Sequence, residues 1–275
     1  MTGHTGFKGG WLSLWLSELG AEVFGYSLSP TEENQFYKDV YKKGFLGEEC
    51  FADITDFHTI LSFIEHLNPD VIFHLAAQPL VSLSYKNPIN TFDVNAMGVV
   101  NILEATRVSG VEPSIVNVTT DKVYKNKKWV RAYREPEELG GEDPYSASKV
   151  CSEIITSSYV NSFFKDSNVR VASARAGNVI GGGDMSKDRL IPDYLRAFMK
   201  NEKIILRNPR ATRPWQHVVE PLAGYLKLAE ALSLKDGHKY VGQWNFGPSG
   251  RATAVDDVIS LLSRITGGKT YKLNP

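Results

Sequence analysis

Tyr145 and Lys149 place a phenol and an ammonium group four residues apart in the run YSASK. On a helix, side chains at this spacing lie on one face. A lysine beside a tyrosine stabilises the phenolate and lowers the pKa of the phenol below its usual value of about 10. The pair therefore predicts a base that removes a hydroxyl proton while a cofactor accepts hydride. The spacing alone is common by chance, so other motifs must support it.

Thr120, Asp121 and Lys122 form a second candidate cluster, which directly follows an apolar strand expected over 114–118. In open parallel sheets, ligands bind at the carboxyl ends of the strands. Thr120 can therefore hydrogen-bond the hydroxyl on which Tyr145 acts. An ordinary polar turn is the alternative for this cluster by itself. The two motifs in this order, about 25 residues apart, are more specific than either alone.

A glycine-rich turn with the spacing GxxGxxG opens the chain and precedes an amphipathic helix. Such glycines let the backbone approach a pyrophosphate, which the amide groups of the helix N-terminus can bind. An ordinary strand-to-helix loop is the alternative. The residues of this turn expected at the cofactor are Gly3, Thr5, Gly6, Phe7, Lys8 and Gly9, and Tyr145 and Lys149 are expected to contact the cofactor as well. Only two residues precede Gly3, so we expect that the natural chain begins earlier with a central strand.

Two further segments fit a dinucleotide site. The carboxylate of Asp53, with Ile54 beside it, can accept a hydrogen bond from an adenine amino group, although an Asp before a helix is more often a cap. Small residues close the strand over 71–75 and let the backbone approach the cofactor; they belong to the run Leu75, Ala76 and Ala77. No acidic residue ends the second strand, where it would select NAD over NADP.

Short apolar strands alternate with helical patterns along the chain, which predicts a parallel sheet covered by helices on both faces. The fold class is therefore α/β, of the doubly wound Rossmann type, with a smaller C-terminal lobe. We expect 1–177 to bind the cofactor, with 214–246 returning to that domain, and 178–213 and 247–275 to bind the substrate. The expected strands are 21–26, 71–75, 114–118 and 169–173, and the expected helices are 56–67, 91–109, 146–164 and 190–200.

Composition excludes several classes of protein. The 31 basic and 31 acidic residues cancel, so no overall field attracts nucleic acid or an anionic membrane. Cys50 and Cys151 lack a metal-ligand spacing, and we expect two reduced thiols and no metal site. With no apolar run of membrane-spanning length and no leader, we expect a soluble, cytoplasmic protein.

These motifs together resemble the extended short-chain dehydrogenase/reductases that act on nucleotide sugars. The resemblance extends from the glycine turn to RAGNVIG at 175–181 and covers almost the whole chain. Within that group the chain is similar to the subfamily that dehydrates CDP-glucose at C4 and C6. The strings that carry this finer likeness are TGHTGFKG, TDKVY, LGGEDPYS, GGGD and RPWQHV. Members of the subfamily are longer, so we expect more of the substrate lobe beyond Pro275.

The resemblance implies NAD as cofactor and an internal redox cycle. Tyr145, with Lys149 and Thr120, removes the 4-hydroxyl proton as hydride passes from C4 to NAD. Water then leaves across C5 and C6, with Asp121 as the acid that protonates the 6-hydroxyl, and hydride returns to C6. Related dehydratases have a glutamate as the C5 base where this chain has Lys122. Lys122 either acts as that base with a lowered pKa or stabilises the enolate, and we favour its participation.

The expected substrate contacts are Asn178, Arg213 and His217, because an arginine fork suits a phosphate. A solvated loop is the alternative for the arginine-rich stretch. The resemblance also implies a homodimer or homotetramer, joined through the helices beginning near Thr91 and Ser146, and a role in bacterial surface deoxysugars. Three other functions stay open: a different nucleotide-sugar dehydratase, a 4-epimerase, and a non-catalytic NAD-binding protein. An epimerase needs no acid–base pair at Asp121 and Lys122.

Overall fold

The computed structural model describes residues 1–41, 44, 46–129, 131–250, 252–269 and 271–273. A parallel sheet forms its centre, in the order β10-β5-β4-β3 followed by β1-β2. Its central strands β4 and β5 are almost wholly buried, which suits a sheet covered on both faces. The strands are β1 (Gly25–Ser27), β2 (Glu49–Phe51), β3 (Val71–His74), β4 (Ser114–Thr120), β5 (Arg170–Ala176) and β10 (Gly242–Phe246).

Thr2 joins the two groups of strands. It forms parallel bridges with Tyr26 of β1 and His74 of β3, and its amide donates to Phe73 O at 2.9 Å. Thr2 therefore occupies the central position of the sheet, between β1 and β3. The sequence predicted a strand at this position, directly before the glycine turn. Gly3 comes directly after it, so the turn is placed at the carboxyl edge of the sheet as a Rossmann fold requires.

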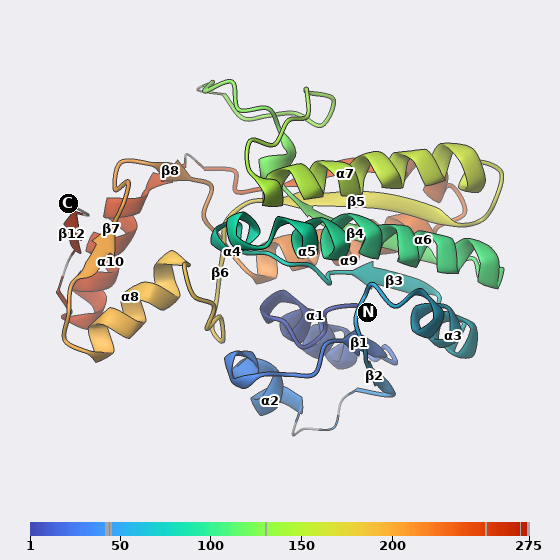
Figure 1. Ribbon diagram of the computed structural model, residues 1–275, viewed down its shortest axis with the longest axis horizontal. Helices are drawn as coiled ribbons and strands as arrows, with labels where there is room; N and C mark the ends of the chain where they lie inside the picture. Colours follow the sequence, from blue (N-terminus) through green and yellow to red (C-terminus); the bar gives the residue numbers. More distant parts are fainter. Residues whose placement is uncertain (42–43, 45, 130, 251, 270, 274–275) are drawn as a thin grey trace.

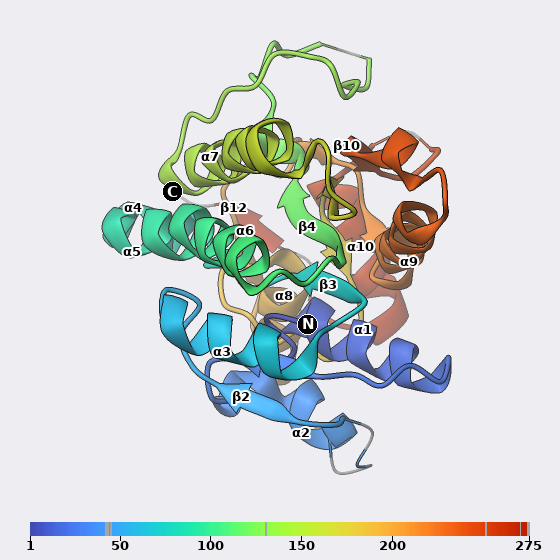
Figure 2. The ribbon, with the colours of Figure 1, turned by 90° about the vertical axis from the view of Figure 1, so that its right-hand side faces the viewer.

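Helices cover both faces of the sheet (Figure 1, Figure 2). One core contains Leu12 of α1 and Leu222 of α9, packed on β4 and β5. The other contains Ile60 of α3 and Ile102 of α6, packed on the opposite face. The doubly wound arrangement predicted from the sequence is present. The helices are α1 (Phe7–Glu18), α2 (Gln35–Tyr41), α3 (Phe57–Leu67), α4 (Val81–Lys86), α5 (Pro88–Phe92), α6 (Gly98–Ser109), α7 (Pro144–Tyr159) and α9 (Val219–Ser233).

Several expected elements differ in their bounds: the strands expected over 114–118 and 169–173 extend to Thr120 and Ala176, and three other elements differ in ways that the contacts explain. The strand expected over 21–26 covers only Gly25–Ser27, because its parallel partner β2 has three residues. The helix expected over 91–109 is divided by a π-helical turn, Asp93–Met97, in which Asn95 bonds the backbone of Gln78. The helix expected over 146–164 begins earlier, at Pro144, and ends in a second π turn, Val160–Phe164.

A smaller group of elements lies at one end of the sheet, to the left in Figure 1. Its own core comprises Tyr194, Ile204, Leu206 and Ile259. The elements are α8 (Leu190–Met199), α10 (Val255–Thr266), and the strand pairs β7 (Ile204–Leu206) with β12 (Tyr271–Leu273), β8 (Thr212–Arg213) with β11 (Thr253–Ala254), and β6 (Val179–Ile180) with β9 (Gln216–His217). Positions 251, 270, 274 and 275 of the expected substrate lobe lie outside the described residues. In the described part of the chain, no helix has the length and apolar character needed to cross a bilayer.

Candidate active site

The first turn of α7 positions the tyrosine and the lysine. Asp143 caps the helix by accepting from Ser146 N at 2.9 Å, and Pro144 begins it with a backbone angle already suited to a helix. Tyr145 therefore stands in the first turn and Lys149 one turn later. Lys149 is buried, and its Nζ donates to Val118 O of β4 at 3.1 Å. The two side chains thus face the sheet as the spacing predicted.

Burial dominates the acid–base behaviour of this pair. It lowers the pKa of Lys149 to about 8, although Glu153 acts in the opposite direction. It also raises the pKa of Tyr145 to about 12, while a hydrogen bond with the Thr120 side chain and the charge of Arg189 lower that pKa. The expectation of a tyrosine pKa below 10 was therefore wrong for the chain by itself, because desolvation outweighs nearby cations.

The polar cluster after β4 adjoins Tyr145. Asp121 begins the short 3₁₀ turn η3 (Asp121–Val123), and a Cβ on Gly177 at the end of β5 would lie 2.6 Å from its Oδ2. Burial raises the pKa of Asp121, while the charge of Lys122 lowers it, and a carboxyl with a raised pKa is suited to donate a proton. Partial burial lowers the pKa of Lys122, whose Nζ lies 5.8 Å from the ring centroid of Tyr145.

The glycine turn packs tightly against the end of β3. Gly3 has a φ of +72°, and a Cβ there would lie 2.8 Å from Ala76 N. A Cβ on Gly9 would lie only 2.0 Å from Gly3 O. The Thr2 hydroxyl accepts from the amides of Leu75 and Ala76 at 3.2 and 3.1 Å. The turn and the β3 end predicted for the cofactor therefore meet at one point of the sheet edge.

Lys8 extends this cluster toward the catalytic residues. Its Nζ donates to the hydroxyl of Tyr225 on α9 at 3.3 Å. Burial, with Arg189 and Lys149 nearby, lowers the pKa of Lys8 to about 8, while Asp121 acts in the opposite direction. Lys8, in the first turn of α1, therefore interacts electrostatically with Lys149 of α7 and with Asp121 at the end of β4.

Residues 1–242 match the family described as the NAD dependent epimerase/dehydratase family. The chain belongs to this family. It is 48% identical over 274 residues to CDP-glucose 4,6-dehydratase of Salmonella typhimurium, covering 97% of this chain and 76% of that protein. It is also 28% identical over 216 residues to UDP-glucose 4-epimerase of Mycoplasma genitalium, covering 75% of this chain and 61% of that protein.

Solved structures share the fold. A dTDP-glucose 4,6-dehydratase of Streptomyces venezuelae, solved with NAD, superimposes with a TM-score of 0.83 at 21% identity, covering 99% of this chain and 87% of that one. A UDP-glucose 4-epimerase of Thermus thermophilus, also solved with NAD, gives a TM-score of 0.82 at 24% identity, covering 100% of this chain and 84% of that one. The predicted Rossmann architecture is confirmed.

The residues at the glycine turn fit NAD, the cofactor of this family. Gly6 caps α1 without a side-chain hydrogen bond, which leaves backbone donors of the first turn for a phosphate. Side chains at Gly3 and Gly9 would fill the space that this backbone needs. Thr5, whose hydroxyl lies 2.6 Å from that of Ser27, ties the turn to the end of β1. These contacts leave the main chain of the turn open to close approach, and pyrophosphate binding there stays a prediction.

Other predicted cofactor residues make local contacts. Asp53 is exposed, and its Oδ1 accepts from the amide and hydroxyl of Thr55 at 2.9 and 2.8 Å. Ile54 is buried against Gly98 of α6, and Asp56 caps α3. Phe7 and Ala77 lie at the predicted places, at the start of α1 and just after β3, and are partly buried. An adenine contact by Asp53 stays a prediction.

The three predicted substrate residues lie around the crossing from the sheet to the smaller group of elements. Asn178 O accepts from Gln216 N, which pairs the chain after β5 with β9. Arg213 is exposed, and its charge reaches both Asp121 and Lys122. His217 is also exposed and meets Trp11 of α1 edge-on at 6.1 Å. Arg213 is thus the one among them with a charge interaction at the catalytic end of β4.

Sequence reasoning missed Arg189. It directly precedes α8, and its Nη1 donates to Asp184 at 3.3 Å. Its charge acts on Tyr145, Lys8 and Lys122, so it belongs to the same cluster. The only sequence signal was the position of Arg189 shortly after the GGGD string. The start of a helix does not reveal which distant side chains the preceding residue will contact.

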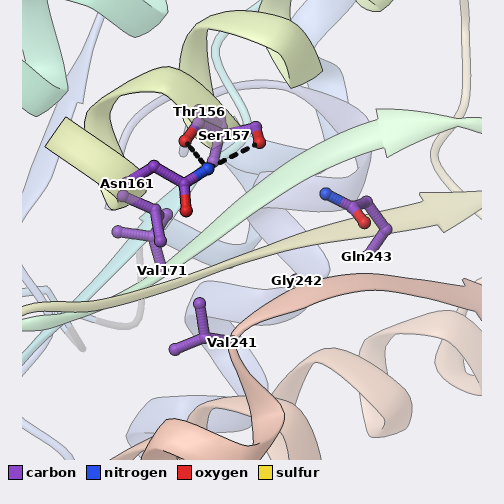
Figure 3. A pocket seen from close by; sticks show the side chains of 8 residues that line it. Thr156, Ser157, Asn161, Val171, Val241, Gly242 and Gln243 are labelled. Atoms are coloured by element: carbon purple, nitrogen blue, oxygen red, sulfur yellow. Dashed lines mark hydrogen bonds between the residues drawn. The ribbon is translucent and has the colours of Figure 1, made fainter. Parts of the chain in front are cut away.

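A separate cavity of about 200 Å³ opens beside the C-terminal half of α7, where β5 and β10 begin (Figure 3). Val171, Val241 and Gln243 line it, and Asn161 bonds back to Ser157 at its rim. It contains none of the predicted site residues. Cys50 and Cys151 form no disulfide in the structure and are both partly buried. Within the described ranges, no three His, Cys, Asp or Glu side chains gather closely enough to hold a metal.

Proposed function

We infer that this chain catalyses the NAD-dependent dehydration of CDP-glucose to CDP-4-keto-6-deoxyglucose. The observation that carries this inference is the 48% identity to a CDP-glucose 4,6-dehydratase over 97% of the chain. A cluster of five side chains supports it: Thr120, Asp121, Lys122, Tyr145 and Lys149. In this cluster Tyr145 is the base for the hydroxyl that is oxidised, and Asp121 and Lys122 are the acid–base pair for the loss of water. The reaction is that of a hydro-lyase.

Tyr145 is the base for the 4-hydroxyl in this proposal. NAD, when bound, supplies the hydride acceptor for C4 and the hydride donor for C6. Lys149, fixed on Val118 O, and the Thr120 hydroxyl stabilise the phenolate that the proton transfer requires. Burial, which raises the pKa of Tyr145 to about 12, is the cost that the Thr120 hydroxyl and the charge of Arg189 oppose.

Asp121 and Lys122 carry the dehydration. Asp121, with its raised pKa, protonates the departing 6-hydroxyl. Lys122, with its lowered pKa and its place beside Tyr145, takes the C5 proton or stabilises the enolate. Lys122→Ala should abolish exchange of solvent hydrogen into C5 and slow turnover. Exchange and turnover near the wild-type rates would remove Lys122 from the mechanism.

The substrate pyrophosphate binds near Asn178, Arg213 and His217 in this proposal, and Arg189 joins them. The arginines carry charges that interact with the catalytic groups, which suits a doubly charged ligand. The division of labour proposed for the chain assigns 1–177 and 214–246 to cofactor binding, and 178–213 and 247–275 to substrate binding. The pairing of β10 with β5, and the separate core of α8 and α10, support it.

A 4-epimerase of nucleotide sugars is the second candidate, favoured by the 28% identity to a UDP-glucose 4-epimerase. Separate incubation of CDP-, dTDP-, UDP- and GDP-linked hexoses with the protein and NAD discriminates the two. The dehydratase gives a 4-keto product that absorbs in alkali, and Tyr145→Phe gives none. A 4-epimer without that product would overturn the proposal, and NAD binding with no turnover would indicate a non-catalytic binding protein.

A homodimer through the helices on one face is also proposed, with a tetramer as its doubled form. α6 and α7 lie side by side on that face (Figure 1). Large apolar side chains are exposed on α7 and on the π turns next to the two helices. Met97 in the π turn before α6 is 48% exposed, Ile154 of α7 is 57% exposed, and Phe163 in the π turn after α7 is 52% exposed. Light scattering on Ile154→Glu should give a monomer if this face is the interface. A cytoplasmic location and a role in surface deoxysugars stay predictions.

A further inference from the structure

Glu153 continues the line of catalytic side chains along α7. It stands four residues after Lys149, as Lys149 stands four after Tyr145, so the three share one face of the helix. Glu153 is only 2% exposed, and it interacts electrostatically with Lys149 in the sense that favours the ammonium form. A buried carboxylate one helical turn from the lysine needs partners of its own.

Arg175 of β5 supplies the main partner. It is 3% exposed and forms a two-pronged ion pair with Glu153, with its Nε 2.9 and 3.0 Å from the two carboxylate oxygens. Its Nη1 also donates to the Tyr124 hydroxyl at 2.6 Å and to Glu135 O at 2.9 Å. The guanidinium is therefore fixed by groups before α7 as well as by Glu153.

β4 holds the lysine and the glutamate at successive residues. Val118 O accepts from Lys149, and the Thr119 hydroxyl donates to Glu153 Oε1 at 2.7 Å. These two contacts tie one face of α7 to β4, alongside the bonds from Asn117 of β4 to Ser152 and Thr156. Lys149 and Glu153 are therefore held against the same strand.

Glu153 differs from the other groups that interact electrostatically with Lys149 in the sign of its charge. Among the described residues, the groups in electrostatic contact with Lys149 are Lys8 of α1, His74 of β3 and Glu153 of α7. Asp121 and Lys122 lie at the end of β4, and Arg175 lies beyond Glu153. Glu153 is the one anion among the three groups in electrostatic contact with Lys149. It is therefore the one of the three that stabilises the ammonium form of Lys149.

We propose that Glu153, held by Arg175 and Thr119, is a positioning residue of the active site, which keeps Lys149 in place and in its ammonium form. This inference rests on the proposed roles of Tyr145 and Lys149. A buried ion pair can also serve the fold alone, and replacing it then changes stability without changing the titration of a neighbour. The two roles differ in what happens to Lys149 when one charge is removed.

The test uses Glu153→Gln, Arg175→Met and the double variant, in the pH profile of kcat/KM for CDP-glucose. Glu153→Gln removes the anion that favours the ammonium form of Lys149 and should move the alkaline limb to lower pH by about one unit. Arg175→Met removes the cation that holds the Glu153 carboxylate in its ionised form, so the limb should also move to lower pH. The double variant lacks the carboxylate as well and should resemble Glu153→Gln.

A second measurement does not need turnover. In protein labelled with [ε-¹³C]lysine, the Lys149 signal, assigned by its loss in Lys149→Arg, reports the protonation of Lys149 directly. Its titration midpoint should shift down in Glu153→Gln and stay near the wild-type value in Glu153→Asp, which keeps the carboxylate. If the wild type fails to dehydrate CDP-glucose, the proposed function falls, while this titration still decides the role of Glu153.

Equal midpoints in the wild type and in a folded Glu153→Gln would overturn the inference. Where Glu153→Gln does not fold, Arg175→Lys and Arg175→Met carry the test. Arg175→Lys keeps the cation beside Glu153 and should leave the midpoint in place, whereas Arg175→Met leaves the buried carboxylate without its cation and should lower the midpoint. Coincident midpoints for these two variants would equally reduce the pair to a structural ion pair.

Discussion

Gly9→Ala should disable the cofactor turn. The added Cβ would lie 2.0 Å from Gly3 O and 2.8 Å from both Gly3 C and His4 Cα, all of them backbone atoms that cannot rotate away. Real Cβ contacts fall essentially never below 3.0 Å, so the turn must open by about 1 Å. Overpacking of this kind costs about 1–3 kcal/mol.

If that strain is expressed in NAD binding, the dissociation constant should rise by about 5- to 150-fold, since 1.4 kcal/mol is a factor of ten. Calorimetric titration with NAD measures the constant, and thermal unfolding measures any cost to the fold. Gly247→Ala is the matched control, because no atom lies within 4 Å of its ideal Cβ. NAD affinity and melting temperature unchanged in Gly9→Ala would refute the close approach of the turn to Gly3 and with it the pyrophosphate site.

Three further predictions concern stability. Thr2→Val should destabilise the protein by about 1–3 kcal/mol in urea unfolding, because two backbone amides lose the hydroxyl that accepts from them. Leu12→Ala should cost about 2–5 kcal/mol, whereas Leu19→Ala, at 65% exposure, should cost little; equal losses would contradict the packing of α1. Burial lowers the pKa of His74 to about 3 from 6.5, so the unfolded chain binds more protons between these values and stability falls as pH decreases below about 6.5. His74→Asn should reduce the slope of unfolding free energy between pH 6 and 5 by about 1.4 kcal/mol per unit, and an unchanged slope would count against a neutral buried His74.

Local sequence determined much of this architecture. Alternating apolar runs and helical patterns are properties of consecutive residues, so the parallel sheet and its covering helices followed from them. The glycine turn and the shared face of Tyr145 and Lys149 depend on spacings of three and four residues, which a short stretch of backbone enforces. Asp143 and Asp56 act as helix caps because capping needs only the next few amides.

Only the tertiary structure decided the electrostatics of the site. Tyr145 has a raised pKa because packing excludes water from its phenol, and no spacing in the chain specifies that exclusion. Arg189 acts on Tyr145, 44 positions before it in the sequence, and Arg175 pairs with Glu153, 22 positions before it. Asp53, by contrast, accepts a hydrogen bond from the amide of Thr55, two residues later in the chain. Desolvation and Coulomb interaction depend on distances between segments that fold together, so they become defined only when the chain is packed.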